Sequence, residues 1–300
     1  MGLSINQNIA AVNSYRNLSN TQNDLSKSLE KLSSGFRINR AADDAAGLAI
    51  SEGLRSQVGG LKVAARNAQD GISVVQTAEG ALTEVHSILQ RLRDLGVQGA
   101  NDSNNTEARA NIKTEADSLV SELDRIAKST NFNGTSLLNK TGGAAELKFQ
   151  VGADGDANSA ITVDLESANV STVATALGNG VADPFAAATR VGGAVTVHAN
   201  KIDFTTHQNS QDSIELIDSQ ISKVSTARAE LGAYQNRFEH TIKNINVSVE
   251  NLSASESRIR DTDMASEMVS FTRAQILSQA GTAMLAQANQ IPQGVLSLLR

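Results

Sequence analysis

The chain has 300 residues, a net charge of −6 at pH 7, 40% hydrophobic residues and 3% aromatic residues. The absence of Cys excludes disulfide scaffolds, cysteine nucleophiles and cysteine-ligated zinc sites. Seven Phe and two Tyr are too few to fill the interior of a typical enzyme of this size. We therefore expect a core of Leu, Ile, Val and Ala, which is typical of helices packed along continuous apolar stripes.

Charge and hydropathy also narrow the classes of partner. The acidic excess lies in the middle of the chain, whereas residues 1–40 and 258–300 are mildly basic. An acidic centre argues against nucleic-acid binding, and the terminal basic residues are spread through an apolar pattern. No apolar run is long enough to span a bilayer, and the first ten residues lack a basic segment followed by an apolar one. We expect no membrane span and no cleaved signal peptide.

Apolar residues spaced by three and four positions predict two long helices at the start of the chain. The first covers about residues 4–33 and stops at Gly35, a residue type that breaks helices. The second runs from the acid pair Asp43 and Asp44, which favours a helix N-terminus, to about Gly99. Adjacent helical residues point about 100° apart, so capping explains this acid pair better than acid and base catalysis.

A third helix and a region of different composition follow. The helix begins at a cap formed by Asn105 or Thr106 and ends at the turn sequence NFNG at 131–134. Residues 141–207 then alternate Gly-rich joints with short β-branched runs. These runs predict a few short strands, at LKFQV (147–151), AITVDL (160–165) and AVTVHANKIDF (194–204).

The longest helical pattern covers residues 214–252, which corresponds to a rod of about 60 Å. A final helix follows it, and Pro292 is the one residue in that helix that disfavours helical structure. Helices at both ends of the chain with a β-like segment between them predict a fold that is mainly α. We expect an elongated antiparallel helical hairpin or coiled-coil bundle, with a small β-rich insert at its distal tip.

The sequence contains no recognisable catalytic motif. It lacks the glycine-rich phosphate loops, the GxSxG elbow and the HExxH zinc motif. The four histidines lie far apart, without spacing typical of metal ligands. We therefore predict no catalytic residue, no cofactor and no metal site. The histidines are His86, His198, His207 and His240.

The second helix carries two apolar stripes about 120° apart. One interpretation is a single wide sector that faces the core, and the other is a second face that packs against a neighbouring molecule. The sequence leaves both open. The core stripe consists of Val85, Leu89 and Leu92, and the second stripe consists of Ile88, Arg91, Leu95 and Gln98.

The terminal helices need partners, because the apolar side chains of a single helix do not offset the entropy lost on ordering it. A pair of terminal helices still exposes Met, Leu and Ile on its other sides. We hypothesise that both termini are mobile in the monomer and become ordered on assembly. The residues that we expect to serve polymerisation and the terminal coiled coil are Ile5, Ile9, Val12, Leu25, Leu29, Leu32, Met264, Met268, Phe271, Ile291, Val295, Leu298 and Leu299.

Three segments together resemble bacterial flagellin. They are SINQNIAAVNSYRNLSNTQNDLSKSLEKLSSGFRINRAADDAAGLAISEGLRSQ, TNFNGTSLL and SRIRDTDMASEMVSFTRAQILSQAGTAMLAQANQIPQGVLSLLR. The resemblance covers about 1–140 and 208–300 and implies a short form with little or no outer variable domain. It further implies an inner coiled-coil domain at 1–43 and 261–300, an outer helical-rod domain at 44–140 and 208–260, and a variable insert at 141–207.

The resemblance also implies function and partners. A flagellin polymerises with itself into the filament used for swimming, after export through the flagellar type III pathway to the cell exterior. Its implied partners are an export chaperone, the filament cap and hook-junction proteins. A hook-filament junction protein is the alternative, and an enzyme carried on this scaffold would need a catalytic motif in 141–207, which shows none.

One motif resembles the surface by which Toll-like receptor 5 recognises many flagellins. It is LQRLRDLGVQ at 89–98, and the resemblance places Arg91, Leu95 and Gln98 in that role, with Glu115 on the next helix. An ordinary exposed role or a role in subunit packing is the alternative for each of these residues.

Overall fold

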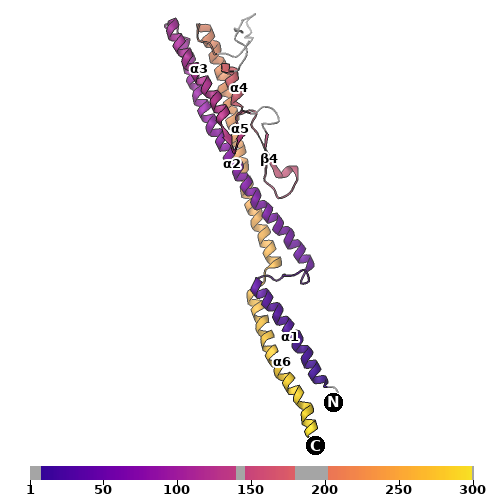
Figure 1. Ribbon diagram of the computed structural model, residues 1–300. Coiled ribbons are helices and arrows are strands. Elements are labelled where there is room, and N and C mark those ends of the chain that lie inside the picture. The colour runs from indigo at the N-terminus through magenta and orange to yellow at the C-terminus, as the bar shows by residue number, and fades with distance from the viewer. Residues whose placement is uncertain (1–7, 140–145, 180–201, 299–300) are drawn as a thin grey trace. The chain divides into compact units, whose positions relative to one another are not determined.

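The computed structural model describes residues 8–139, 146–179 and 202–298, with side chains through Gln290 (Figure 1). Long helices dominate it, which confirms the mainly α class. They are α1 (Ile9–Ser34), α2 (Ala45–Gly99), α3 (Thr106–Ser129), α5 (His207–Arg260) and α6 (Met264–Leu298).

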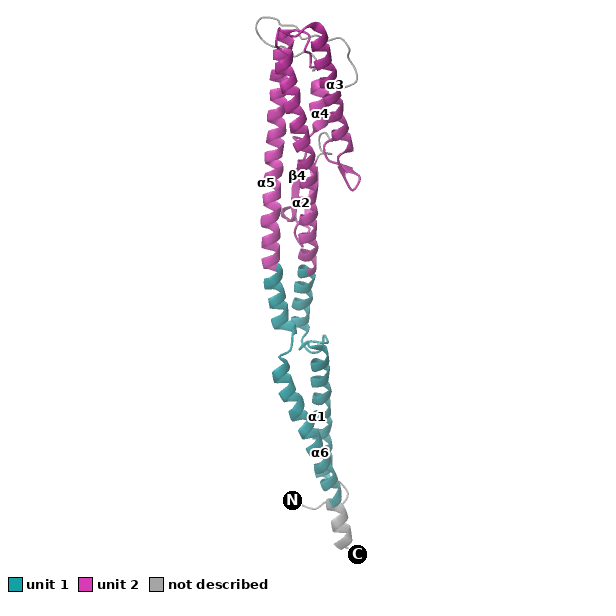
Figure 2. Cartoon of the chain, turned by 90° about the vertical axis from the view of Figure 1, so that its left-hand side faces the viewer, with its two compact units in different colours: residues 1–58, 249–300 teal, residues 59–248 magenta. Residues whose placement is uncertain are grey.

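The chain forms two compact units, shown in different colours in Figure 2. One unit comprises residues 1–58 and 249–300, and the other comprises residues 59–248. Both divisions fall inside helices, in α2 and in α5. The domain boundaries near residues 43 and 261 that the resemblance implies stay a prediction.

Polar side chains set the helix ends as the sequence predicts. The side chain of Asn105 accepts a hydrogen bond from the Ala108 amide at 2.7 Å, which identifies Asn105 as the cap of α3. Asp44 likewise accepts from the Gly47 amide at 2.8 Å, at the start of α2. Gly35 ends α1 with a left-handed φ of 77°, a conformation that glycine adopts without steric strain.

Several predicted boundaries shift by a few residues. Helix α5 begins at His207 and ends at Arg260, so it extends beyond the 214–252 pattern at both ends. The backbone of α6 stays helical past Pro292. The polar residues that flank the apolar repeat of α5 carry little periodic signal, which is why the pattern alone makes the helix too short at both ends.

The unit of residues 59–248 has a core of large aliphatic and aromatic side chains. Leu82, Leu89 and Leu92 of α2 are fully buried, as are Leu123 of α3 and Phe238 of α5. Helix α3 lies beside α2 (Figure 2). The stripe predicted for α2 from Leu89 and its neighbours is thus confirmed as core.

The turn predicted at 131–134 is a tight hairpin between β1 (Asn131–Phe132) and β2 (Thr135–Ser136). Asn133 and Gly134 at its centre have φ values of 50° and 77°. Two successive residues with positive φ are typical of a two-residue hairpin turn, for which Asn-Gly is the preferred sequence.

The insert contains two of the three predicted strands. β3 (Glu146–Gln150) and β4 (Ala160–Asp164) pair antiparallel, with Phe149 opposite Ile161. Most of the third predicted run, 194–201, lies outside the described residues, and 202–204 is not a strand. The sequence did not predict α4 (Val170–Ala174) or the short helical turn Thr175–Asn179.

The strand pair does not lie at the helix tip, where we expected the insert. The Asn67 side-chain amide of α2 donates to the Gln150 carbonyl at 3.0 Å, and the Phe149 ring packs edge-on against Phe238 of α5 at 5.5 Å between centroids. A two-stranded sheet cannot bury its own apolar face, so β3 and β4 cover theirs along the sides of α2 and α5.

Candidate assembly surface

Helices α1 and α6 run antiparallel, side by side (Figure 2). Lys31 near the end of α1 forms an ion pair of 3.7 Å with Glu267 near the start of α6. At the other end, the Asn8 side chain donates to the Ala288 carbonyl at 2.8 Å. We call the least exposed residues between them the terminal seam. It consists of Ala11, Ser14, Leu18, Thr21, Leu25, Ser28 and Leu32 of α1, and Glu267, Phe271, Ala274, Ser278, Gly281, Leu285 and Ala288 of α6.

The terminal seam repeats at steps of three and four residues, as in a coiled coil, but many of its members are small. Only Ser28, Ala274 and Ala288 in it are buried. A Cβ atom added to Gly281 would lie 3.2 Å from the Leu18 Cδ1 atom, so the two helices approach closely at that position. Small seam residues bury little apolar area, so they contribute little apolar stabilisation to the pair.

Larger apolar side chains of the same two helices face solvent. Val12 and Ile9 of α1 are 67% and 66% exposed, and Met284 of α6 is 63% exposed. Isolated chains rarely expose this many large apolar residues on one pair of helices unless a partner covers them. We call this set the outer apolar surface. It consists of Ile9, Val12, Tyr15, Leu29, Met264, Met268, Val269, Ile276, Leu277 and Met284.

A groove of about 440 Å³ lies within the outer apolar surface on α6. Its only polar lining residues are Thr272 and Arg273. Such a groove suits an apolar side chain from another helix better than a small polar ligand. The apolar lining residues are Met268, Val269, Ile276 and Leu277.

The structure separates the predicted coiled-coil contacts into two groups. Leu25, Leu32 and Phe271 lie in the terminal seam. Ile9, Val12, Leu29, Met264 and Met268 do not, because they belong to the outer apolar surface. Ile5 and Leu299 lie outside the described residues, and the side chains of Ile291, Val295 and Leu298 are likewise not described.

The division into two groups has a physical reason. Large apolar residues spaced by three and four positions form a stripe on any face of a helix. The spacing therefore does not tell which stripe meets the partner helix of the same chain. The seam on α6 is instead indicated by small residues that recur along the helix. They are Ala274, Ser278, Gly281 and Ala288. Small residues at heptad spacing permit close helix approach and thus indicate the inner stripe.

Hydrogen bonds and an ion pair connect the loop before α2 with the loop before α6. We call this set of contacts, between residues 35–52 and 260–262, the joint. The Arg37 amide donates to the Arg260 carbonyl at 2.7 Å, and the Thr262 amide donates to the Gly35 carbonyl at 3.0 Å. The Arg260 guanidinium stacks 4.7 Å over the Phe36 ring and pairs with Glu52 at 2.7 Å. Sequence reasoning missed this joint, because its partners are more than 200 residues apart.

The four candidate receptor residues differ in their exposure to solvent. Arg91 of α2 and Glu115 of α3 form an ion pair of 2.6 Å, and both side chains are about half exposed. Gln98 is exposed as well. Leu95 is only 1% exposed, so it belongs to the core and not to a second exposed stripe. At Leu95 the wide core-facing sector is therefore the better interpretation of the two stripes.

Glycines beside this motif make room for neighbouring side chains. A Cβ atom on Gly96 would lie 2.9 Å from an Ile214 side-chain carbon, and one on Gly99 would lie 3.1 Å from the Phe204 Cβ atom. Phe204 is fully buried. The glycines thus let the start of α5 and the segment before it pack against the end of α2.

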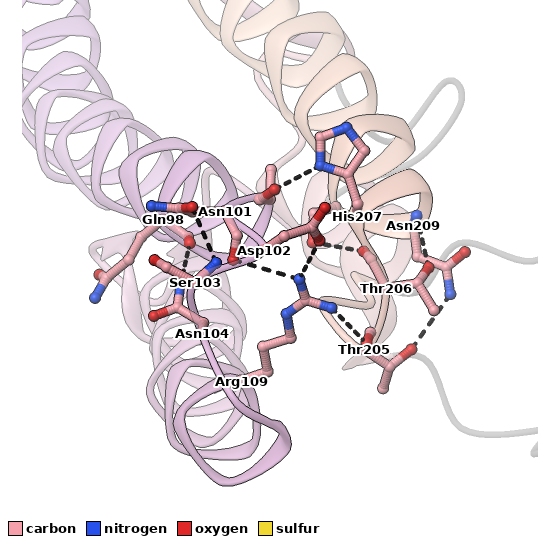
Figure 3. A network of polar contacts seen from close by, with 12 residues as sticks. Gln98, Asn101, Asp102, Ser103, Asn104, Arg109, Thr205, Thr206, His207 and Asn209 are labelled. Atoms are coloured by element: carbon pink, nitrogen blue, oxygen red, sulfur yellow. Dashed lines mark hydrogen bonds and ion pairs between the residues drawn. The ribbon is translucent and has the colours of Figure 1, made fainter.

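A polar network joins the turn between α2 and α3 to the start of α5 (Figure 3). Arg109 pairs with Asp102 at 2.9 Å and donates to the Thr205 carbonyl at 3.1 Å. The His207 ring Nδ1 atom lies 2.5 Å from the Ala100 carbonyl oxygen. These contacts give His207 a structural role in holding the turn.

Two findings concern the described part of the chain only. In it, no group of three His, Asp or Glu side chains is arranged to hold a metal ion. None of its helices combines the length and the apolarity needed to cross a bilayer.

Family models match both ends of the chain. The model of the bacterial flagellin N-terminal helical region matches residues 5–142, and the model of the C-terminal helical region matches residues 214–299. The chain belongs to the bacterial flagellin family. The two matched regions contain the terminal seam and the outer apolar surface in full.

Relatives match the chain over nearly its whole length. Flagellin from Halalkalibacterium halodurans is 51% identical over 296 residues, and flagellin from Bacillus subtilis is 49% identical over 316 residues. The flagellar filament 33 kDa core protein of Treponema phagedenis is 46% identical over 304 residues. In all three pairs the alignment covers 99% of this chain and 99% of the relative. A short flagellin form accounts for the length of 300 residues.

Proposed function

We propose that the chain is the structural subunit of a flagellar filament and polymerises with itself through the outer apolar surface. Flagellins are structural filament proteins, and full-length relatives include filament core proteins. The observation that carries the proposed mode of assembly is the pairing of α1 with α6 through a seam in which many residues are small. That pairing leaves Ile9, Val12 and Met284 exposed to a second copy.

The terminal seam serves this function by aligning the two ends of one chain. Lys31, Glu267 and Asn8 fix the antiparallel register of α1 and α6. The larger apolar side chains then pack against the same surface on other copies and are removed from contact with water. Each such side chain contributes roughly 1.5–3 kcal/mol on full burial, so many moderate contacts add up along a polymer.

A pair of matched variants tests this role of the outer apolar surface. In Val12→Ser, a side chain that is 67% exposed becomes polar, so the monomer keeps its fold while polymerisation is lost or strongly reduced. Ser19→Ala changes a neighbouring exposed residue of α1 and is the control. Electron microscopy of purified chains measures the outcome. Filaments of ordinary length and yield from Val12→Ser contradict the proposed surface.

Removal of residues 291–300 tests the same proposal more severely. The truncated chain is expected to stay soluble and to form no filament, because it loses the last part of the helix that pairs with α1. Intact filaments from the truncated chain contradict the proposal.

The family supports further expectations about the life of the subunit. We infer that it leaves the cell through the flagellar export pathway and acts outside the cell without catalytic activity. A chaperone, the filament cap and hook-junction proteins are the partners we expect. A role as a hook-filament junction protein is not favoured, because full-length relatives are flagellins and filament core proteins.

Recognition by Toll-like receptor 5 is a second candidate function, and the exposed Arg91–Glu115 pair supports it. We expect the chain to activate reporter cells that carry this receptor, and Arg91→Ala to lower its potency at least tenfold. Arg125→Ala removes another exposed α3 ion pair, with Glu122, and is the control. A wild-type chain that is silent at saturating dose contradicts this candidate.

A further inference from the structure

The methionines of this chain are concentrated on one helix. The sequence has four Met, no Cys and no Trp. Three of the four, Met264, Met268 and Met284, lie on α6, and the fourth is Met1, outside the described residues. All three α6 methionines belong to the outer apolar surface, with exposures of 49%, 51% and 63%. The chain thus carries its readily oxidised sulfur atoms on the surface that we assign to assembly.

We propose that these methionines form an oxidation-sensitive site, at which peroxide converts the thioethers to sulfoxides and blocks assembly of the free subunit. The inference rests on the proposed function, because it needs the outer apolar surface to be the polymerisation surface. It goes beyond that function by assigning a chemical modification and its consequence.

The chemistry is an oxygen transfer. A lone pair of the methionine sulfur attacks one peroxide oxygen, a sulfur–oxygen bond forms and the oxygen–oxygen bond breaks. A proton moves to the departing hydroxide, which leaves as water. Sulfur is oxidised by two electrons and hydrogen peroxide is reduced by two. The reaction needs access to the sulfur, and half-exposed side chains in the unassembled chain allow that access.

Met268 is the residue where the effect on assembly is most direct. It lines the apolar groove on α6 together with Val269, Ile276 and Leu277. Met264 lies one helical turn before it, on the same flank of α6. A sulfoxide places a strongly polar oxygen into this groove, and burying it against an apolar partner leaves that oxygen without a hydrogen bond.

The unassembled chain is expected to tolerate the same change. None of the three methionines belongs to the terminal seam, and none is buried. Their oxidation therefore leaves the intrachain packing of α1 against α6 intact. The thioether also explains the choice of methionine, since a flexible, polarisable side chain adapts to irregular contacts between copies. Oxidation removes this adaptability from the surface that uses it.

Seeded growth of filaments tests the proposal. Monomers are treated with hydrogen peroxide until mass spectrometry finds one added oxygen on each α6 methionine, and the peroxide is then removed. We expect the elongation rate on untreated filament seeds to fall at least tenfold while the circular dichroism spectrum stays unchanged. Treatment with the two methionine sulfoxide reductases, one for each sulfoxide epimer, is expected to restore growth.

The matched control replaces all three residues, as Met264→Leu, Met268→Leu and Met284→Leu. Leucine is close in size and apolar, so this variant is expected to elongate before and after peroxide alike. Equal loss of growth in the control after peroxide overturns the proposal, as does undiminished growth of the fully oxidised wild type. Should the triple variant fail to grow even untreated, the reductase repair of the wild type decides the question.

Protection within the filament gives an independent readout. We expect peroxide to oxidise the three methionines at least tenfold more slowly in assembled filaments than in monomers. Equal rates overturn the assignment of these residues to contacts between copies. Failure of the untreated wild type to polymerise has a different meaning, because it contradicts the proposed function itself.

Discussion

The α1–α6 pair and the three-helix region of α2, α3 and α5 are both built from long helices, yet they bury different side chains. In the latter, Leu82, Leu89 and Phe238 are fully buried. In the α1–α6 pair, the buried residues are Ser28, Ala274 and Ala288, and the side chains of the outer apolar surface are exposed. A high helix content therefore does not mean that a region buries its own large apolar side chains. One region completes its core within the chain, and the other leaves large apolar side chains exposed, which we propose other copies cover.

The largest effect expected from a single substitution lies in the region with a complete core. Phe238→Ala removes a fully buried ring that contacts Phe149, and we expect the free energy of unfolding to fall by about 3–5 kcal/mol. Tyr15→Ala, at a 66% exposed site of α1, is the control and is expected to change it by less than about 0.5 kcal/mol. Urea denaturation of monomers measures both. Similar losses in the two variants contradict the contrast between the regions.

A substitution in the terminal seam is expected to change the equilibrium between monomers and filaments. Gly281→Leu forces a large side chain against Leu18 and separates α1 from α6. Overpacking of this kind costs about 1–3 kcal/mol, so we expect the monomer concentration at equilibrium with filaments to rise about tenfold or more. The control is Gly80→Leu, where an added Cβ atom meets nothing within 4 Å. An unchanged equilibrium concentration for Gly281→Leu contradicts the close approach of the two helices.

Substitutions of two glycines of α2 are expected to change the free energy of unfolding by smaller amounts. Gly80→Ala adds a methyl group in open space and improves helix propensity, so we expect a gain of about 0.5–1 kcal/mol in unfolding free energy. Gly71→Ala is the opposite case, because its Cβ atom would lie 2.8 Å from the Phe238 ring. It is expected to destabilise the same region. Thermal melts of the two variants should shift in opposite directions, and shifts of the same sign contradict this core packing.

Most of the fold follows from the sequence, because its helices are long and have strong caps. Asn105, Asp44 and Gly35 are recognisable as helix ends from residue type and spacing alone. The short helix α4 is missed, since it is too brief to show a period, and it forms where Val170 and Val173 find an apolar surface to cover. The position of the β3–β4 pair is missed because it depends on Phe238, far away in the sequence.

The candidate surface is predicted less completely. The sequence identifies the apolar residues of α1 and α6, but it puts Ile9, Val12 and Met268 in one set for polymerisation and the coiled coil, and it does not single out Ser28, Ala274 and Gly281 as the intrachain contact. Spacing reveals that a residue faces some partner, and it does not distinguish the same chain from another copy. Arg91 and Glu115 are both named by the resemblance, and the structure adds the ion pair between them, which the sequence did not predict.

A small, pH-dependent effect is expected at the loop before α2. The Arg40 and Asn39 amides donate to the Asp43 carboxylate at 2.9 and 3.2 Å. Chiefly the Arg40 hydrogen bond lowers the pKa of Asp43 below its usual value of 3.8. A lowered folded-state pKa means that the carboxylate stabilises the loop above pH 3.8 and loses this effect as the pH falls through the folded-state pKa.

Asp43→Asn tests this effect by removing the charge at every pH. We expect the variant to be less stable than the wild type at neutral pH, and the difference to shrink below about pH 4 as the wild-type carboxyl is protonated. Thermal unfolding over a series of acidic buffers measures it. A difference that grows towards low pH has the wrong sign and contradicts the role of Asp43 as a hydrogen-bond acceptor.

Hydrogen–deuterium exchange tests most directly whether the terminal pair is completed only by other copies. The experiment compares amides of α1 and α6 with amides of residues 71–99 of α2, in a verified monomer and in filaments. We predict that the α2 amides are protected in both states, whereas those of α1 and α6 exchange rapidly in the monomer and become protected in the filament. Protection of α1 and α6 in the monomer equal to that of α2 would contradict the account.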